Sequence, residues 1–160
     1  MIQIEIQSAD VMGAIEQLHR KIGNLSEPMG DIGNYLMNMT EESFDNERSP
    51  DGEAWHPLAE STLRYKAKYG GHKILQSKDS NTVRSLSHDA SDTSVIVGVN
   101  AYSSKGYEYP IAHQFGTDKA GRSKSVRIEA RPFFPITQDG ELVDNVKVEV
   151  LEIIMGYLEG

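Results

Sequence analysis

Apolar residues recur along the first quarter of the chain at two different spacings. Isoleucines alternate with polar residues over residues 2–6, which predicts a half-buried strand. Helical spacing follows, interrupted at Gly23-Asn24, and predicts one helix over residues 10–22, capped by Asp10, and a second over 26–44. The apolar stripes of these helices, which we expect to face the core, are Val11, Ile15, Leu18 and Ile22, then Met29, Ile32, Leu36 and Met39.

The middle of the chain combines turn signals with one short helix. Proline and Asp-Gly favour a tight reversal over residues 48–52. Residues 59–69 are expected to form a short helix that Gly70-Gly71 ends. Isolated apolar positions over residues 72–90 predict only a short element and an extended piece.

Three segments in the second half have the character of strands. Residues 95–99 are a continuous β-branched run around a glycine. Residues 107–115 are a second candidate, which Pro110 places at a sheet edge or a bulge. Residues 125–129 alternate cleanly, and the polar, basic segment 117–127 is expected to be a long loop, mobile in the free subunit.

The end of the chain has the clearest helical periodicity, although a strand also fits its valines. The stripe predicts a helix capped by Asp139, and its apolar residues are Val143, Val146, Val150, Ile153, Ile154 and Tyr157. Taken together, the patterns predict a single α+β domain over residues 1–160. We expect an antiparallel β-meander packed with N- and C-terminal helices and a long inter-strand loop.

Composition narrows the function classes. A chain of 160 residues is large enough to bury a core, and its net charge of −8 argues against general nucleic-acid binding. We expect no specific nucleic-acid partner either. The absence of cysteine excludes disulfides and thiolate metal sites and is compatible with a reducing compartment. No stretch approaches the ~20 apolar residues of a membrane-spanning helix, and the N-terminus lacks the pattern of a signal peptide. We expect a soluble protein made in a cytoplasm, without a membrane partner.

The sequence contains few residue patterns that are typical of a catalytic site. The five histidines have no metal-ligand spacing, and no phosphate-binding glycine loop is present, so we expect no cofactor, no metal and no catalytic residue. The alternative is a small hydrolase or nuclease that uses His113 with Asp118 or Glu108. A hydrogen-bonded structural role for this histidine is the favoured interpretation. Tyr65 and Tyr69 lie near lysines, which is a weak indication of a nucleic-acid binding patch. A solvated helix face explains these residues better.

One basic segment stands out from the acidic chain. Residues 119–131 hold five basic residues and one acidic residue, which leaves 11 basic and 23 acidic residues elsewhere. A basic loop on an acidic body can guide self-association or docking on an acidic partner, and a solvated hairpin loop is the alternative. The candidate interaction residues are Lys119, Arg122, Lys124, Arg127 and Arg131, with an acidic counterpart in Glu141, Asp144, Glu149 and Glu152.

Five motifs in register resemble the phage virion morphogenesis family, the tail-completion proteins of Mu-like and related contractile-tailed phages. They are Ser49–Leu58, Thr62 with Lys66, Val95–Gly98, Ile111–Gly116 and Ala130–Phe134. Leu75–Asp79 and Phe134-Pro135 depart from the family's usual pattern. The structural motif residues are Trp55, Pro57, Leu58, His113, Gln114, Phe115, Gly116, Arg131, Pro132 and Phe133. Of these, we expect Trp55 and Phe115 to be buried, with the indole N–H of Trp55 bonded to a carbonyl.

The resemblance implies a non-enzymatic structural protein at the head-proximal end of the tail, assembled in the host cytoplasm. Related joining and terminator proteins form rings, often of six copies, that cap the tail tube and receive the head. The implied partners are further copies of the chain, tail tube or sheath proteins, and head connector proteins. A host-derived binding module is a third interpretation.

Overall fold

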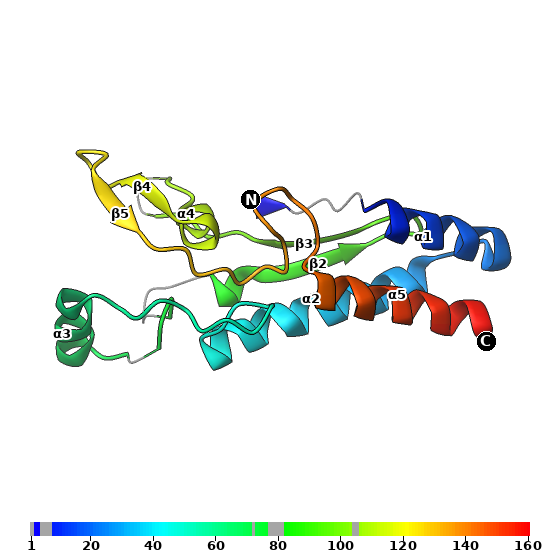
Figure 1. The fold of residues 1–160 in the computed structure, drawn as a ribbon, viewed down its shortest axis with the longest axis horizontal. Coiled ribbons are helices and arrows are strands. Elements are labelled where there is room, and N and C mark those ends of the chain that lie inside the picture. The colour runs from blue at the N-terminus through cyan, green and yellow to red at the C-terminus, as the bar shows by residue number, and fades with distance from the viewer. Residues whose placement is uncertain (1, 4–7, 72, 77–81, 104–105) are drawn as a thin grey trace.

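The computed structural model describes residues 2–3, 8–71, 73–76, 82–103 and 106–160, and Figure 1 shows how they are arranged. Within these residues the helices are α1 (Ala9–Ile22), α2 (Ser26–Asn46), α3 (Glu60–Tyr69), α4 (Tyr109–Phe115) and α5 (Asp144–Glu159), with one 3-10 turn, η1 (Val83–Ser85). The strands are β1 (Ile2–Gln3), β2 (Leu86–Ala90), β3 (Val95–Val99), β4 (Thr117–Ala120) and β5 (Val126–Ile128).

A three-stranded antiparallel sheet with the order β1-β3-β2 lies against α2. The register of β2 and β3 runs from Leu86 opposite Val99 to Ala90 opposite Val95. Gly33 lets α2 come close to this sheet, because a Cβ there would lie 2.5 Å from Nδ1 of His88. The predicted strand over residues 95–99 is confirmed as β3.

The core lies where α1, α2 and α5 meet each other and the sheet. Most of the predicted stripe residues are buried there, and Leu18, Val146 and Ile154 are fully enclosed. Ile22 is an exception because it lies exposed in the last turn of α1. The two predicted N-terminal helices, their interruption and the short third helix are therefore confirmed.

Two predicted helix caps are wrong. Ser8 precedes α1, while Asp10 lies in its first turn and pairs with Lys147 of α5, Oδ2 to Nζ 2.7 Å. The last helix begins at Asp144, because Asp139 lies in a turn that pairs residues 136 and 142. Over residues 146–150 the helix, and not the strand, is confirmed, since α5 buries Val146 and Val150 on one face.

The α+β class is confirmed, but the expected meander is not formed from the predicted segments. Residues 109–115 are helix α4 and not a strand, because Pro110 sits in the first turn of a helix, where its missing N–H costs nothing. The basic segment then forms β4, a turn and β5, which pair as a separate two-stranded sheet. The predicted strand at 125–129 is confirmed as β5.

Some sequence expectations fall on residues outside the described ranges. These include Ile4 and Ile6 of the first strand, His72, and residues 77–79 of the segment that departs from the family pattern. The short element and extended piece expected before residue 90 correspond to η1 and β2. Among the residues that the structure describes, no helix combines the length and apolar character needed to cross a membrane.

Candidate functional site

Three of the sequence motifs meet in a structural joint formed by residues 55–58, α4 and residues 130–134. The Trp55 indole donates a hydrogen bond to the Pro132 carbonyl, with Nε1 and O 2.7 Å apart. Arg131 reaches back to the same segment, where Nε donates to the His56 carbonyl at 2.9 Å and Nη2 to the Pro57 carbonyl at 3.0 Å. Segments 75 residues apart in sequence are thus fastened directly to each other.

Gln114 fixes α4 to the other side of the joint. Its side-chain Oε1 accepts hydrogen bonds from the backbone N–H groups of Phe133 at 3.0 Å and Phe134 at 2.9 Å, and its Nε2 donates to the Phe134 carbonyl at 3.0 Å. Because the side chain is buried, these bonds satisfy backbone groups that water does not reach. The Arg131 N–H donates to the His113 carbonyl at 2.6 Å and completes the attachment.

An aromatic cluster ties the joint to the core. Phe44 of α2 meets Trp55 edge-on at 5.5 Å between ring centroids and Phe133 at 5.0 Å. Phe133 also contacts Phe134 at 4.8 Å. The expected burial of Trp55 is confirmed, whereas Phe115 is only half-buried.

Gly116 connects the joint to the β4–β5 hairpin. Its φ is 72°, in the region that favours glycine, and a Cβ there would lie 3.0 Å from both the Ala130 nitrogen and the Ile128 carbonyl oxygen. The glycine therefore allows the two arms of the hairpin to close at their base.

His113 does not make the expected side-chain hydrogen bond at Nδ1. This atom is buried, without a hydrogen-bond partner in the described part of the chain. Burial and the neighbouring Arg131 guanidinium lower the pKa of His113 to about 4, so the imidazole is neutral near pH 7. This depressed pKa does not favour the hydrolase alternative, because so weak a base removes protons poorly at neutral pH. Its proposed partner Asp118 is exposed and lies 3.9 Å from Arg127.

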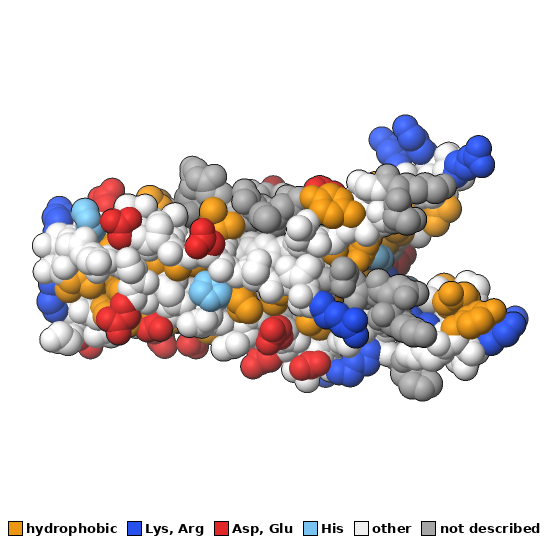
Figure 2. All heavy atoms as spheres, turned by 180° about the vertical axis from the view of Figure 1, so that it is seen from behind, with side chains coloured by type: hydrophobic (Ala, Val, Ile, Leu, Met, Phe, Trp, Pro, Cys, Tyr) orange, Lys and Arg blue, Asp and Glu red, His pale blue; other side chains and the backbone are white. Residues whose placement is uncertain are grey.

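The joint supports two projections at one end of the molecule, which we call the hairpin prong (β4–β5, residues 117–128) and the helix prong (α3, residues 60–69). Figure 1 shows both extending beyond the sheet and the helical core. Figure 2 shows Lys and Arg side chains at the ends of both prongs and Asp and Glu side chains along the body. The basic segment expected from the sequence therefore lies at this end, beside a second basic projection.

The five candidate interaction residues differ in their surroundings. Lys119, Arg122 and Lys124 are exposed at the tip of the hairpin prong. Arg127 pairs with Glu129, Nε to Oε1 3.0 Å. Arg131 is only 8% exposed and belongs to the joint. The tip therefore offers three cations for docking.

The helix prong is a feature that sequence reasoning missed. No residue of α3 is buried, and Tyr65 and Tyr69 are 64% and 58% exposed. Their rings lie 4.7 Å apart, and the Lys68 ammonium lies 5.2 Å from the Tyr69 ring. Two tyrosines four residues apart, on a helix without a matching apolar stripe, were the signal available in the sequence.

Between the prongs lies an open cleft of about 1000 Å³. Leu58, His113 and Phe133 of the joint line it together with Ile128 of the hairpin prong and Lys66 of the helix prong. Lys66 also fastens α3 to the body, since its Nζ donates to the carbonyl of Lys73 at 2.7 Å. Among the described residues, no group of three or more acidic or histidine side chains could hold a metal ion.

Comparison with known proteins gives one family. A sequence model of the phage virion morphogenesis family matches residues 6–159. The Mu-like prophage FluMu G protein 2 of Haemophilus influenzae is 28% identical over 160 residues, which cover 99% of this chain and 97% of that protein. No solved structure matches the chain.

Proposed function

The chain belongs to the phage virion morphogenesis family, and from this premise we propose that it completes the head-proximal end of a phage tail and takes part in joining the tail to the head. The family and the Mu-like prophage relative support a structural role in building the virion. Within that role, we propose that several copies assemble into a ring. The ring contacts tail tube or sheath proteins on one side and head connector proteins on the other.

The observation that carries the proposal is the basic hairpin prong on an acidic body. Lys119, Arg122 and Lys124 project from a chain whose net charge is −8. Each surface ion pair contributes only ~0–1 kcal/mol, so several such pairs must act together to hold the hairpin prong on a partner. The acidic surface of an adjacent copy and an acidic tail end are the chemical partners that such a tip fits.

The role in the virion is tested by removing the protein from the phage. We expect lysates without it to contain heads and tails that are not joined, visible by electron microscopy, and supply of the protein to restore complete particles. Complete, infectious particles formed in its absence would contradict the proposal.

The hairpin prong is tested separately with the triple variant Lys119→Glu, Arg122→Glu and Lys124→Glu. We expect a folded monomer in light scattering that does not complete tails, because the reversed tip repels acidic surfaces. A control that reverses the exposed Arg20 and Arg84 changes the charge elsewhere and is expected to assemble normally. Normal tail completion by the triple variant would show that the hairpin is only a solvated loop.

Hydrogen exchange gives a second measure of the hairpin prong. The turn between β4 and β5 has exposed residues and depends on few contacts within the subunit. We expect its amides to exchange rapidly in the monomer and slowly after assembly. Equal protection in both states would contradict its docking role.

A further inference from the structure

The helix prong lacks the packing that a short helix needs. Isolated helices shorter than about 12 residues are marginal in water, and most helical stability in proteins comes from burying an apolar face. The ten residues of α3 bury none of their side chains within the subunit. Lys66 and the half-buried Thr62 face the body, while Leu63, Tyr65 and Tyr69 remain exposed.

A surface of complementary character lies on α5. Its solvent-exposed face repeats at intervals of four, three and four residues through Val148, Glu152, Met155 and Glu159. Val148 and Met155 are 52% and 45% exposed, and Glu149 borders the same face. Two apolar side chains surrounded by carboxylates thus form one stripe along the helix.

The two surfaces match in both charge and packing. α3 carries three basic residues against one acidic residue, and its exposed aromatic rings offer large contact area. The α5 stripe supplies carboxylates for Arg64 and Lys68 and a methionine, whose thioether packs well against aromatic rings. Arg64 already pairs with Glu60 of its own helix, but this pair is exposed and so contributes little, which leaves the guanidinium able to bind the carboxylates of α5.

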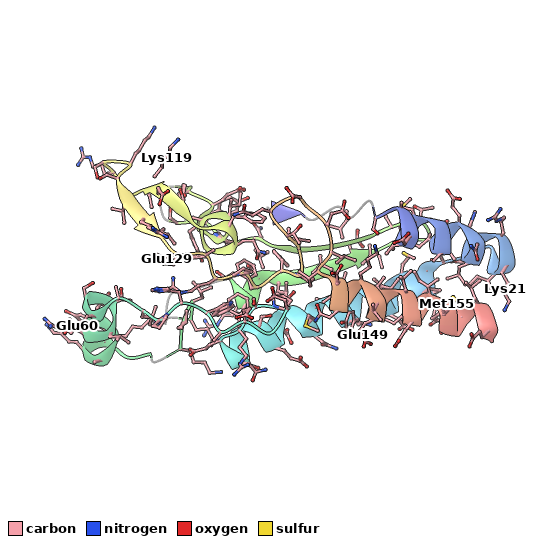
Figure 3. All side chains as sticks on the ribbon, viewed as in Figure 1. Lys21, Glu60, Lys119, Glu129, Glu149 and Met155 are labelled. Atoms are coloured by element: carbon pink, nitrogen blue, oxygen red, sulfur yellow. The ribbon has the colours of Figure 1, made fainter. Side chains whose placement is uncertain are left out.

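These surfaces cannot meet within one subunit. Figure 3 shows Glu60 of α3 at one end of the molecule and Met155 of α5 near the other. A contact that joins two different surfaces of identical subunits is head-to-tail, and it closes into a ring or continues as a filament.

We propose that α3 is the docking helix of a head-to-tail contact between copies of this chain, and that the exposed face of α5 on the next copy receives it. This inference rests on the proposed self-association and assigns its contacting surfaces. Docking buries the tyrosines and pairs the basic residues of α3 with the carboxylates of α5. The hairpin prong then contacts the same neighbouring copy.

A charge exchange tests the pairing. One variant carries Arg64→Glu with Lys68→Glu, and the other carries Glu149→Lys with Glu152→Lys. We expect each variant alone to associate at least tenfold more weakly than wild type, because like charges then face each other. Mixing the two at equal amounts, or combining all four changes in one chain, is expected to restore association to within about threefold of wild type.

Apolar variants test the direction of the contact. We expect Leu63→Ser with Tyr69→Ser, and Val148→Ser with Met155→Ser, to be monomeric separately. Mixed together they are expected to stop at pairs in light scattering, because only one intact contact is available per pair. The control Arg20→Glu with Arg84→Glu is expected to assemble like wild type, and circular dichroism checks that every variant is folded.

The outcomes separate this inference from the proposed function. If wild type forms no oligomer, the proposed ring and this contact both fail. If wild type assembles and the α3 or α5 variants assemble equally well, only the assigned contact is overturned. The assigned contact is also overturned if both charge-reversed variants lose association and mixing them does not restore it. It is overturned as well if the α3 variant self-associates normally but fails to complete tails, because α3 then contacts a different virion protein.

Discussion

At the scale of single residues, the local sequence around Trp55 predicted the burial of its ring but not the group that it contacts. A lone tryptophan in a segment without converging polar groups predicts a buried ring with its N–H bonded to a carbonyl, and both are confirmed. The identity of that carbonyl, on Pro132, was not predictable because it lies 77 residues away. The three bonds of Gln114 were missed for the same reason, since periodicity records which residues are buried and not what they contact.

We expect Trp55→Ala to lower the free energy of unfolding by roughly 3–5 kcal/mol, because it leaves a cavity beside Phe44 and removes the hydrogen bond to the half-buried Pro132 carbonyl. Trp55→Phe keeps most of the packing and is expected to cost less than Trp55→Ala. Urea unfolding of both variants measures the difference. An alanine variant as stable as wild type would show that the joint does not depend on this ring.

The lowered pKa of His113 predicts that the free energy of unfolding depends on pH. Its pKa is about 4 in the folded chain against 6.5 for the free side chain, so the unfolded chain binds more protons between these values. The contribution of the neutral His113 side chain to the free energy of unfolding is therefore complete above about pH 6.5. It is lost as the pH falls toward 4, by up to roughly 3 kcal/mol. In urea unfolding across this range, His113→Gln is expected to flatten the loss, whereas His19→Gln, at an exposed site, is expected to keep it. Parallel curves for His113→Gln and wild type would contradict this origin.

The same substitution tests whether His113 has a catalytic role. Because glutamine keeps neutral hydrogen-bonding groups and the histidine is neutral at pH 7, we expect His113→Gln to complete tails largely as wild type does. Particle yield after complementation measures this. A variant that folds and oligomerises normally but gives inactive particles would count against a purely structural histidine.

At the scale of elements, the sequence predicted the long periodic helices better than the short segments. Several turns of apolar residues reinforce one another in α1, α2 and α5, so their existence was clear even where their caps were not. The segment 109–115 is short enough that helix and strand patterns overlap, and the position of Pro110 decides between them. The sequence favoured a solvated face for α3, and no residue of this helix is buried, but its position as a projection beside the hairpin prong was not predictable because the two segments are far apart along the chain.

Gly116 is where the hairpin prong depends on one backbone conformation. We expect Gly116→Ala to destabilise the fold by roughly 1–3 kcal/mol, since its φ is 72° and the added methyl meets the backbone of residues 128 and 130. Gly140→Ala, with a φ of 82° but open space around its Cβ, separates the cost of conformation from that of the clash. Thermal unfolding measures both. Equal losses would show that the hairpin base tolerates the methyl.

At the scale of the whole molecule, the fold separates charges that the sequence only partly separates. The sequence identified the basic stretch 119–131, but it could not show that α3 projects at the same end, because the two are far apart along the chain. The joint places both prongs at this end of the molecule. Arg131 belongs to the basic stretch but forms hydrogen bonds inside the joint. The result is a molecule with Lys and Arg side chains at the ends of both prongs and Asp and Glu side chains along the body (Figure 2), while the last turn of α1 carries a further basic group.

This charge separation predicts that self-association weakens with salt while the subunit stays folded. The Debye length falls from about 10 Å at 0.1 M salt to about 3 Å at 1 M, which screens exposed charges across an interface far more than it affects the buried apolar core. We therefore expect sedimentation to show at least a tenfold loss of affinity between about 0.05 and 0.5 M NaCl, with a nearly unchanged melting temperature. A quadruple variant that exchanges the charges of α3 and α5 is expected to keep this salt dependence, because it restores opposite charges in reversed positions. If association is insensitive to salt, or is strengthened by it, apolar contacts alone hold the copies together.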